Sequence, residues 1–311
     1  MGRKFAPLAD RMTAYREIRK MVKAGCPPSA ARIAARLEEI GCPRPSRETI
    51  RRWAMGANSP FTNLRVFEPR PSEELSFFLG AWLGDGWADT NDGGKRLLLK
   101  VRSYDFAKEF AASAARVLGK TDSYWVRRVT DKHGRWYLVK VTSLMLYGFV
   151  DQPLTILSGC IEQCPKGFLR GFFTAEGSTS ISVERTPIPY LGVGVVVANT
   201  DRELLEFVRS LLAKQGLAPG AIRLSITAGK RTNLGVAQKS GWMVTLSRIS
   251  CVKRFALEIG FADSVKQDKL IHALSLVEKY GTRGAVKEWL EAYDKIGKRW
   301  MEKETTTSSG Q

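Results

Sequence analysis

Apolar and polar residues in the first part of the chain alternate at the spacing of short amphipathic helices. Three such segments, separated by Pro-rich turns, are predicted as helices at residues 13–25, 29–41 and 46–56. Ser29 and Ser46 stand where the second and third helices need an N-cap. In the third helix Ile50 and Trp53 form an apolar stripe. This spacing predicts a helix-turn-helix domain over residues 1–60.

After a Pro- and Asn-rich linker at residues 61–73, the pattern becomes a repeat. Residues 74–160 predict the order helix, hairpin, helix, hairpin, helix, and residues 161–280 repeat that order as a second, unequal copy. Residues 281–311 predict a basic helical tail with a disordered end. The fold class is therefore α+β, with two tandem α/β repeats whose antiparallel sheets follow a small all-α domain.

Each repeat opens with the same nine-residue pattern, FLGAWLGDG at 78–86 and LRGFFTAEG at 169–177. Small residues lie four apart in both segments, Gly80 and Gly84 in the first and Gly171 and Ala175 in the second. Residues four apart share one helix face, so each helix presents a strip without bulky side chains. Glycine inside a helix costs about 1 kcal/mol relative to alanine, which indicates that close packing of the two helices compensates for it.

Such packing brings together Asp85 and Glu176, the acids that end the two patterns. Both are predicted at helix C-termini, where the helix dipole disfavours an anion unless a cation is present. Two carboxylates, with the backbone carbonyls of Gly84 and Ala175, provide the oxygen ligands that Mg²⁺ prefers. A metal held there would activate water for phosphodiester hydrolysis. A single acidic turn of this kind is usually only a helix stop, and the prediction depends on the repetition.

Charge identifies the class of partner. The 311 residues include 49 Lys plus Arg against 31 Asp plus Glu, a net charge of +18, which a polyanion would relieve. Residues 1–60 contain 13 of the basic and five of the acidic residues, so this small domain is disproportionately basic. Nucleic acid is the expected partner, although a ribosomal protein or a binder of anionic membranes has similar composition. The apolar stretches are too short to span a membrane, and a cytoplasmic, nucleoid-associated protein is expected.

Cysteine and histidine limit the chemistry. The five cysteines are too scattered for a zinc site, since only Cys160 and Cys164 are close in sequence. The two histidines, His133 and His272, lie in no recognisable motif. Free thiols are expected, and nuclease chemistry based on histidine and metal is disfavoured.

Basic residues recur where a nucleic-acid surface is predicted. In the third helix they are Arg47, Arg51 and Arg52. In the hairpins of the first repeat they are Lys95, Arg96, Lys100, Arg127, Arg128, Arg135 and Lys140. In the second repeat they are Arg185, Arg223, Lys230, Arg231 and Lys239. Solvated helix and sheet faces have the same composition, but repetition in both halves favours a groove-binding surface.

The paired nine-residue pattern resembles the signature of the LAGLIDADG homing endonucleases, with Asp85 and Glu176 at its last acid. The resemblance extends over roughly residues 74–280, and the 91-residue spacing of the two acids resembles single-chain members with two motifs. Archaeal intron-encoded members look similar, including a preceding helix-turn-helix and the GANSP link at 56–60.

This resemblance implies a saddle of antiparallel sheets over double-stranded DNA, and a monomer that makes a staggered cut in a long pseudo-palindromic target. It implies Mg²⁺ as cofactor, for which Mn²⁺ or Ca²⁺ can substitute in the site. By position Lys266 resembles the active-site lysine of the family, and Arg102 and Asn199 resemble its polar helpers. The first repeat has no clear counterpart of the Lys266 segment.

Two other functions fit the same scaffold. An intron-splicing maturase would bind structured intron RNA with the basic sheets, and a transcriptional regulator would use the helix-turn-helix. The two acids argue against a protein that only binds DNA, because carboxylates repel phosphate unless a cation intervenes. The sequence therefore favours a metal-dependent site-specific endonuclease and leaves the maturase open.

Overall fold

The computed structural model describes residues 8–24, 29–42, 45–56, 60, 67–89, 95–184, 187–232, 235–297 and 299–303. Two compact units compose the chain: Met1–Glu68 with Ala88–Arg96 and Thr142–Gly148, and Pro69–Trp87 with Leu97–Val141 and Phe149–Gln311. The predicted boundaries at residues 60, 73, 160 and 280 are not the points at which these units divide, and they stay a prediction.

The N-terminal segment contains the three predicted helices, α1 (Leu8–Lys23), α2 (Ala30–Glu39) and α3 (Arg47–Ala54). The hydroxyls of Ser29 and Ser46 accept from the backbone N–H groups of Arg32 and Thr49, as N-caps do. A small core forms where the apolar stripes meet, and Ile50 and Trp53 are buried in it. The three predicted helices are therefore present as a packed unit, the first of them beginning earlier than expected, and the helix-turn-helix assignment stays a prediction.

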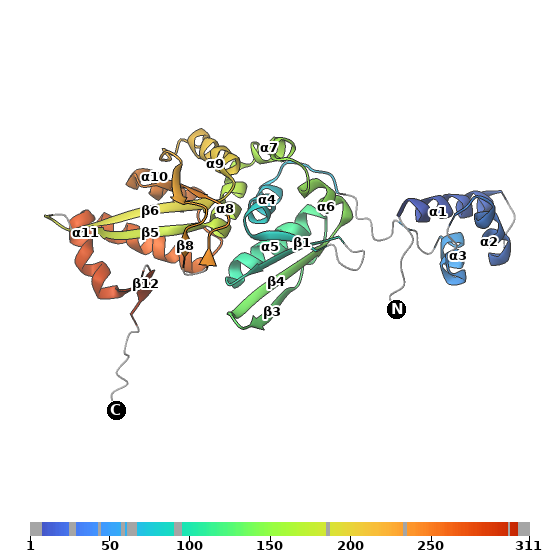
Figure 1. Ribbon diagram of the computed structural model, residues 1–311, viewed down its shortest axis with the longest axis horizontal. Helices are drawn as coiled ribbons and strands as arrows, with labels where there is room; N and C mark the ends of the chain where they lie inside the picture. Colours follow the sequence, from blue (N-terminus) through green and yellow to red (C-terminus); the bar gives the residue numbers. More distant parts are fainter. Residues whose placement is uncertain are drawn as a thin grey trace, which may run out of the picture. The chain divides into compact units, whose positions relative to one another are not determined.

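The larger part of the chain contains the two repeats, each with a four-stranded antiparallel sheet (Figure 1). The first repeat comprises α4 (Glu73–Asp85), β1 (Gly86–Asp89), β2 (Arg96–Val101), α5 (Tyr104–Val117), β3 (Val126–Asp131), β4 (Gly134–Thr142), α6 (Leu144–Val150) and α7 (Leu154–Ile161). The second comprises α8 (Pro165–Glu176), β5 (Gly177–Glu184), β6 (Tyr190–Asn199), α9 (Arg202–Lys214), β7 (Arg223–Ile226), β8 (Arg231–Thr232), β9 (Gly235–Val236), β10 (Gly241–Leu246), α10 (Ile249–Glu258) and α11 (Ser264–Ala292).

Strand order is the same in the two sheets, β1-β2-β4-β3 in the first and β5-β6-β10-β7 in the second. Alternation of buried and accessible residues along the central strands explains why each sheet has one covered face. In β6 the side chains of Val195 and Val197 are fully buried, and in β2 those of Leu97 and Leu99 are. The fold class predicted from the sequence is confirmed, including the tandem repetition.

The C-terminal region differs from the predicted helical tail. Helix α11 passes Gly281, which has a left-handed φ of 69°, and continues to Ala292. The chain then forms a hairpin of β11 (Tyr293–Ile296) and β12 (Arg299–Glu302). Trp289 and Trp300 are buried beside Tyr293, so the hairpin adds a small aromatic core that helical periodicity did not reveal. The predicted disordered end, residues 305–311, lies outside the described residues.

No single helix in the described ranges is long and apolar enough to cross a membrane, and only the sharply bent pair of α6 and α7 reaches the required length and composition together.

Candidate active site

Helices α4 and α8 pack against each other along strips of small residues. A Cβ on Gly80 would meet the backbone of Phe168 and lie 2.8 Å from Phe172 N, and one on Gly171 would meet the backbone of Phe77 and lie 2.8 Å from Ala81 N. Gly80 and Gly171 occupy equivalent positions in the two repeats, and each meets the partner helix in the same way. Helix backbones come this close only where a side chain is missing, which confirms the close approach predicted from the glycine spacing.

At the C-terminal ends of these helices the same packing brings the acids together. A Cβ on Gly84 would meet Ala175 and lie 3.2 Å from Glu176 Cγ. Each acid is the last helical residue, and the next residue starts a strand of the sheet. The glycines after the acids are required by space, since a Cβ there would lie 2.6 Å from Trp82 O in the first turn and 2.5 Å from Phe173 O in the second.

Burial among protein atoms changes the protonation of this pair. Desolvation first, and then the charge of Asp85, raise the pKa of Glu176 to about 7 against the opposing charge of Lys266. Desolvation also raises the pKa of Asp85, again opposed by Lys266. Asp85 is nevertheless exposed at the surface, whereas Glu176 is half-buried. Two carboxylates whose charged forms are disfavoured in this way define a site that a cation would stabilise.

Lys266 lies near the start of α11. Among the described residues, it is the cation whose charge lowers the pKa of both Asp85 and Glu176. Its Nζ donates to Thr174 O at 2.6 Å and to Gly177 O at 2.7 Å, carbonyls on either side of Glu176. Desolvation lowers the pKa of Lys266, while Asp263, Asp85 and Glu176 raise it. The two hydrogen bonds of this lysine therefore hold the backbone of the second acidic turn in place.

The two predicted polar helpers have different surroundings. Asn199, at the end of β6, donates from Nδ2 to Glu176 Oε1 at 3.1 Å, and its Oδ1 accepts from Asp201 N at 2.8 Å, which orients the amide. Arg102, just after β2, donates to His133 O at 3.0 Å and lies 4.7 Å from the ring centroid of Trp136. The structure thus brings Asn199 into contact with Glu176, whereas the side chain of Arg102 packs against the β3–β4 hairpin.

The donor set suits a hard divalent cation. Within the described residues, no three Cys, His, Asp or Glu side chains gather, so a metal at the acidic turns would have two carboxylates as side-chain ligands. Mg²⁺ is commonly held by one or two carboxylates and keeps several waters. The carbonyls of Gly84 and Ala175 lie in the last helical turns, where intrahelical donors run out. The residues present fit Mg²⁺ better than a softer metal.

Basic residues of the first sheet lie within its strands. Lys100 forms an ion pair with Asp131 at 2.7 Å, a contact that, with the His133 N–H, lowers the pKa of that acid to about 2. Arg96 lies 3.6 Å from Asp89, and Lys95 lies over the ring of Tyr147. The remaining cations are exposed on the strands: Arg127, Arg128, Arg135 and Lys140.

The second sheet does not repeat this arrangement. Arg223 is the first residue of β7, Lys230 and Lys239 lie in turns, and Arg231 is in the short β8. Arg185 lies outside the described residues. Of the predicted cations of this half, Arg223 and Arg231 lie on strands and Lys230 and Lys239 lie in turns, and their role in DNA binding stays a prediction.

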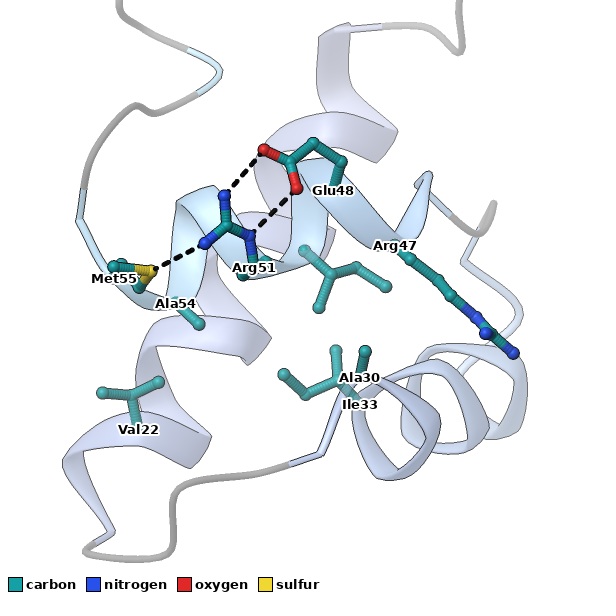
Figure 2. A pocket seen from close by; sticks show the side chains of 9 residues that line it. Val22, Ala30, Ile33, Arg47, Glu48, Arg51, Ala54 and Met55 are labelled. Carbon is teal, nitrogen blue, oxygen red and sulfur yellow. Dashed lines mark hydrogen bonds and ion pairs between the residues drawn. The ribbon is translucent and has the colours of Figure 1, made fainter.

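In the helical segment, Figure 2 shows an open hollow lined by residues such as Val22, Ile33 and Met55. Glu48 binds Arg51 at 2.9 Å and Arg52 at 2.8 Å, and all three side chains are about half exposed. Arg47 points along the other side of the hollow in the same view. Exposed ion pairs contribute little energy, so phosphate can compete for these arginines.

Sequence reasoning missed two residues that build the second acidic turn. Thr174 Oγ1 donates to Arg170 O at 2.6 Å and accepts from Ala262 N at 2.8 Å, which joins α8 to the segment before α11. Asp263 caps α11 by accepting from Lys266 N. An Asp directly before an amphipathic helical pattern is an N-cap signal and could have been found. The Thr174 contacts span 88 residues and have no local signal.

Residues 163–260 match the model of the LAGLIDADG-like domain. The chain is 28% identical over 242 residues to the uncharacterized protein MJ0398 of Methanocaldococcus jannaschii, covering 76% of this chain and 84% of that protein. A crystal structure of I-DmoI in complex with DNA and Ca is similar with a TM-score of 0.45 and 18% identity, over 64% of this chain and 97% of that one. The N-terminal LAGLIDADG domain of DUF199/WhiA is similar with a TM-score of 0.39 and 16% identity, over 60% of this chain and 82% of that one.

Proposed function

We propose that this chain, whose residues 163–260 are a LAGLIDADG-like domain, is a site-specific endonuclease that hydrolyses both strands of duplex DNA with a divalent metal. The observation that carries the proposal is the pairing of Asp85 and Glu176 at the ends of two closely packed helices. A protein that only bound DNA would gain nothing from two desolvated carboxylates facing a polyanion.

In the proposed reaction Asp85 and Glu176 hold Mg²⁺, with the carbonyls of Gly84 and Ala175 as further ligands. The metal, when bound, supplies an activated water and stabilises the leaving 3′-oxygen. Asn199 holds Glu176 in a fixed orientation through its 3.1 Å hydrogen bond. Lys266 holds the carbonyls around Glu176 in place and lowers the cost of ionising both acids.

The proposed substrate is a long duplex with two related half-sites. The two sheets have the same strand order and follow equivalent helices, which suits a near-palindromic target read by one chain. The three-helix segment would bind DNA that flanks this target. Net charge of +18 supports a nucleic-acid partner.

The test compares Asp85→Asn and Glu176→Gln with wild type on cleavage, in Mg²⁺, of a plasmid that carries the DNA from the two sides of the coding sequence joined together. Asp122→Asn and Glu203→Gln are matched controls at exposed positions. We expect linear product from wild type and both controls, and loss of at least about 10²-fold in rate in both site variants, as removal of one electrostatic group in an active site causes. Cleavage that survives in both site variants would refute the proposal.

A further inference from the structure

The two nine-residue patterns differ at two positions that lie one helical turn apart on the same side of the helix. Where the first pattern has Leu79 and Leu83, the second has Arg170 and Thr174. Leu79 is fully buried, whereas Arg170 is half-buried and its guanidinium forms an ion pair. A charged group is rarely placed among packed helices unless it has partners there. The leucines of the first pattern cannot make the hydrogen bonds that these two polar residues make.

Arg170 joins α8 to two other segments through its guanidinium. Nε and one terminal nitrogen donate to the two carboxylate oxygens of Glu109 in α5, both at 2.9 Å. The other terminal nitrogen donates to Ile259 O, directly after α10, at 3.2 Å. A planar guanidinium binds a carboxylate with two hydrogen bonds and keeps a donor for a third group, which a lysine ammonium does not do in the same geometry. Arg170 therefore holds a helix of the first repeat and the connection between α10 and α11 at the same time.

Two more side chains fix this connection, which spans residues 259–263. Thr174 Oγ1 accepts from Ala262 N at 2.8 Å. From the side of α11, the Gln267 amide accepts from Phe261 N at 2.9 Å. Backbone groups of a connection have no regular partner in a helix or sheet, so the side chains that bind them determine its path. The connection is therefore tied to α8 near both of its ends.

The path of the connection determines where α11 begins and where its lysine points. Asp263 is the last residue of the connection and caps α11 by accepting from Lys266 N. The ammonium group of Lys266 then reaches Thr174 O at 2.6 Å and Gly177 O at 2.7 Å. A shift of the connection would move this ammonium group relative to the second acidic turn.

Helix α5 of the first repeat holds the same segment at a second point. Ser264 Oγ, in the first turn of α11, donates to Asp105 Oδ2 at 2.6 Å. Asp105 and Glu109 lie four residues apart on α5, so they share one helix face. Two open hollows flank the ion pair of Glu109 and Arg170, and both residues line each hollow. Because the space beside the pair is open, its hydrogen bonds rather than apolar packing hold this point.

We infer that Arg170 and Glu109 are positioning residues for Lys266. Their ion pair joins the two repeats, fixes the connection before α11 and thereby places the ammonium group at the second acidic turn. The inference rests on the proposed function and adds to it a contribution of the first repeat to the lysine of the second. Misplacement of an active-site group by about 1 Å can cost about 10²-fold in rate, even when the substitution lies far from the reaction.

The first experiment treats the full chain with trace acetic anhydride and measures the acetylation rate of each lysine by mass spectrometry. It needs neither DNA nor cleavage. In Arg170→Gln, Lys266 should react about 3- to 10-fold faster than in wild type, which corresponds to the loss of one hydrogen bond. Lys269 is the internal reference, since it lies on the same helix and its Nζ also donates to a carbonyl, Trp300 O at 2.7 Å. An unchanged rate at Lys266, or an equal rise at Lys269, would overturn the inference.

The matched control is Arg254→Gln. This arginine of α10 also joins a carboxylate to a backbone carbonyl, since it donates to Glu258 at 3.1 Å and to Gly216 O at 3.2 Å. Neither contact involves residues 259–263. The control should leave the acetylation rate of Lys266 at its wild-type value. An equal rise in the control would show that any loosening near α10 exposes the lysine, and the assignment to Arg170 would be wrong.

The second experiment measures cleavage of the plasmid with joined flanks in Mg²⁺ over a range of substrate concentrations. Arg170→Gln should lower kcat by about 10- to 100-fold, as loss of a residue that orients an active-site ligand does, and leave KM near its wild-type value. Glu109→Gln should act in the same direction and less strongly, because Arg170 keeps its carbonyl contact.

A double-mutant comparison separates positioning from general weakening. In the Lys266→Met background, Arg170→Gln should have no further effect on kcat, because residues that act through one another are not additive. Effects of the two substitutions that multiply would contradict the positioning role. A wild type that cuts no duplex would refute the nuclease proposal, whereas the acetylation rates would still decide whether Arg170 positions Lys266.

Discussion

Glu176→Gln is expected to stabilise the protein at alkaline pH while it abolishes cleavage. In the folded chain the pKa of Glu176 is raised from 4.5 to about 7 by desolvation and by Asp85. The folded state therefore holds this proton more tightly than the unfolded chain. Its stabilising effect is full below pH 4.5 and is lost as the pH rises toward 7.

The magnitude follows from the size of the pKa change. A rise from 4.5 to about 7 corresponds to about 3 kcal/mol against the ionised form, at about 1.4 kcal/mol for each pH unit. Partial solvent access of Glu176 reduces this to about 2 kcal/mol. Glutamine cannot ionise, keeps the shape of the side chain and can still accept from Asn199.

The assay is urea unfolding of wild type and Glu176→Gln in EDTA at pH 5.0 and pH 8.5, with Glu203→Gln as an exposed control. We expect a difference of less than about 1 kcal/mol at pH 5.0, just above the unfolded pKa, and an advantage of about 2 kcal/mol for Glu176→Gln at pH 8.5. Addition of Mg²⁺ at pH 8.5 should then stabilise wild type more than the variant. A variant that is less stable than wild type at pH 8.5 would refute the view that this carboxylate is desolvated.

Three further outcomes are expected. Gly80→Ala should lower the unfolding free energy, measured by thermal melts, by about 1–3 kcal/mol, because the added Cβ overlaps the Phe168 backbone. Gly159→Ala is the control: it has open space around it and should be neutral or stabilising in the same measurement. Lys266→Met should slow cleavage and move the midpoint of its pH profile upward, since this lysine lowers the pKa of both acids; an unshifted midpoint would exclude that role. Trp300→Phe should cost about 1–2 kcal/mol in urea unfolding, because Ile181 O loses the 2.9 Å hydrogen bond from Nε1, and an unchanged midpoint would show that water replaces it.

Sequence reasoning reached the architecture because the signals were local. Helix caps at Ser29 and Ser46, period-two strands, and two copies of one nine-residue pattern each depend on residues close in the chain. The approach of α4 and α8 could also be predicted, since glycines four apart define one strip on a helix. Even the requirement for glycine after each acid is local, because a Cβ at that position would collide with the carbonyl oxygen four residues earlier in the chain.

Other parts of the site depend on contacts between distant segments. The hydrogen bonds of Lys266 to carbonyls around Glu176 join residues about ninety apart; the family resemblance pointed to the lysine, and nothing in the sequence predicted these contacts. The basic residues of the second half lie partly on strands and partly in turns, and strand register and turn length decide that placement, which charge counts cannot predict. The β11–β12 hairpin replaced a predicted helix because Trp289, Tyr293 and Trp300 pack together, which outweighs local helix propensity.

The central claim is that Asp85 and Glu176 act together as a metal-dependent nuclease centre. The most direct measurement incubates wild type, Asp85→Asn and Glu176→Gln with Mg²⁺ and a plasmid substrate. The plasmid carries the uninterrupted allele, in which the DNA on the two sides of the coding sequence is joined directly. The account predicts one linear product from wild type, with ends at a single site, and intact plasmid from both variants. Intact plasmid with wild type, together with splicing of its own intron RNA by the same preparation, would contradict it and favour a maturase.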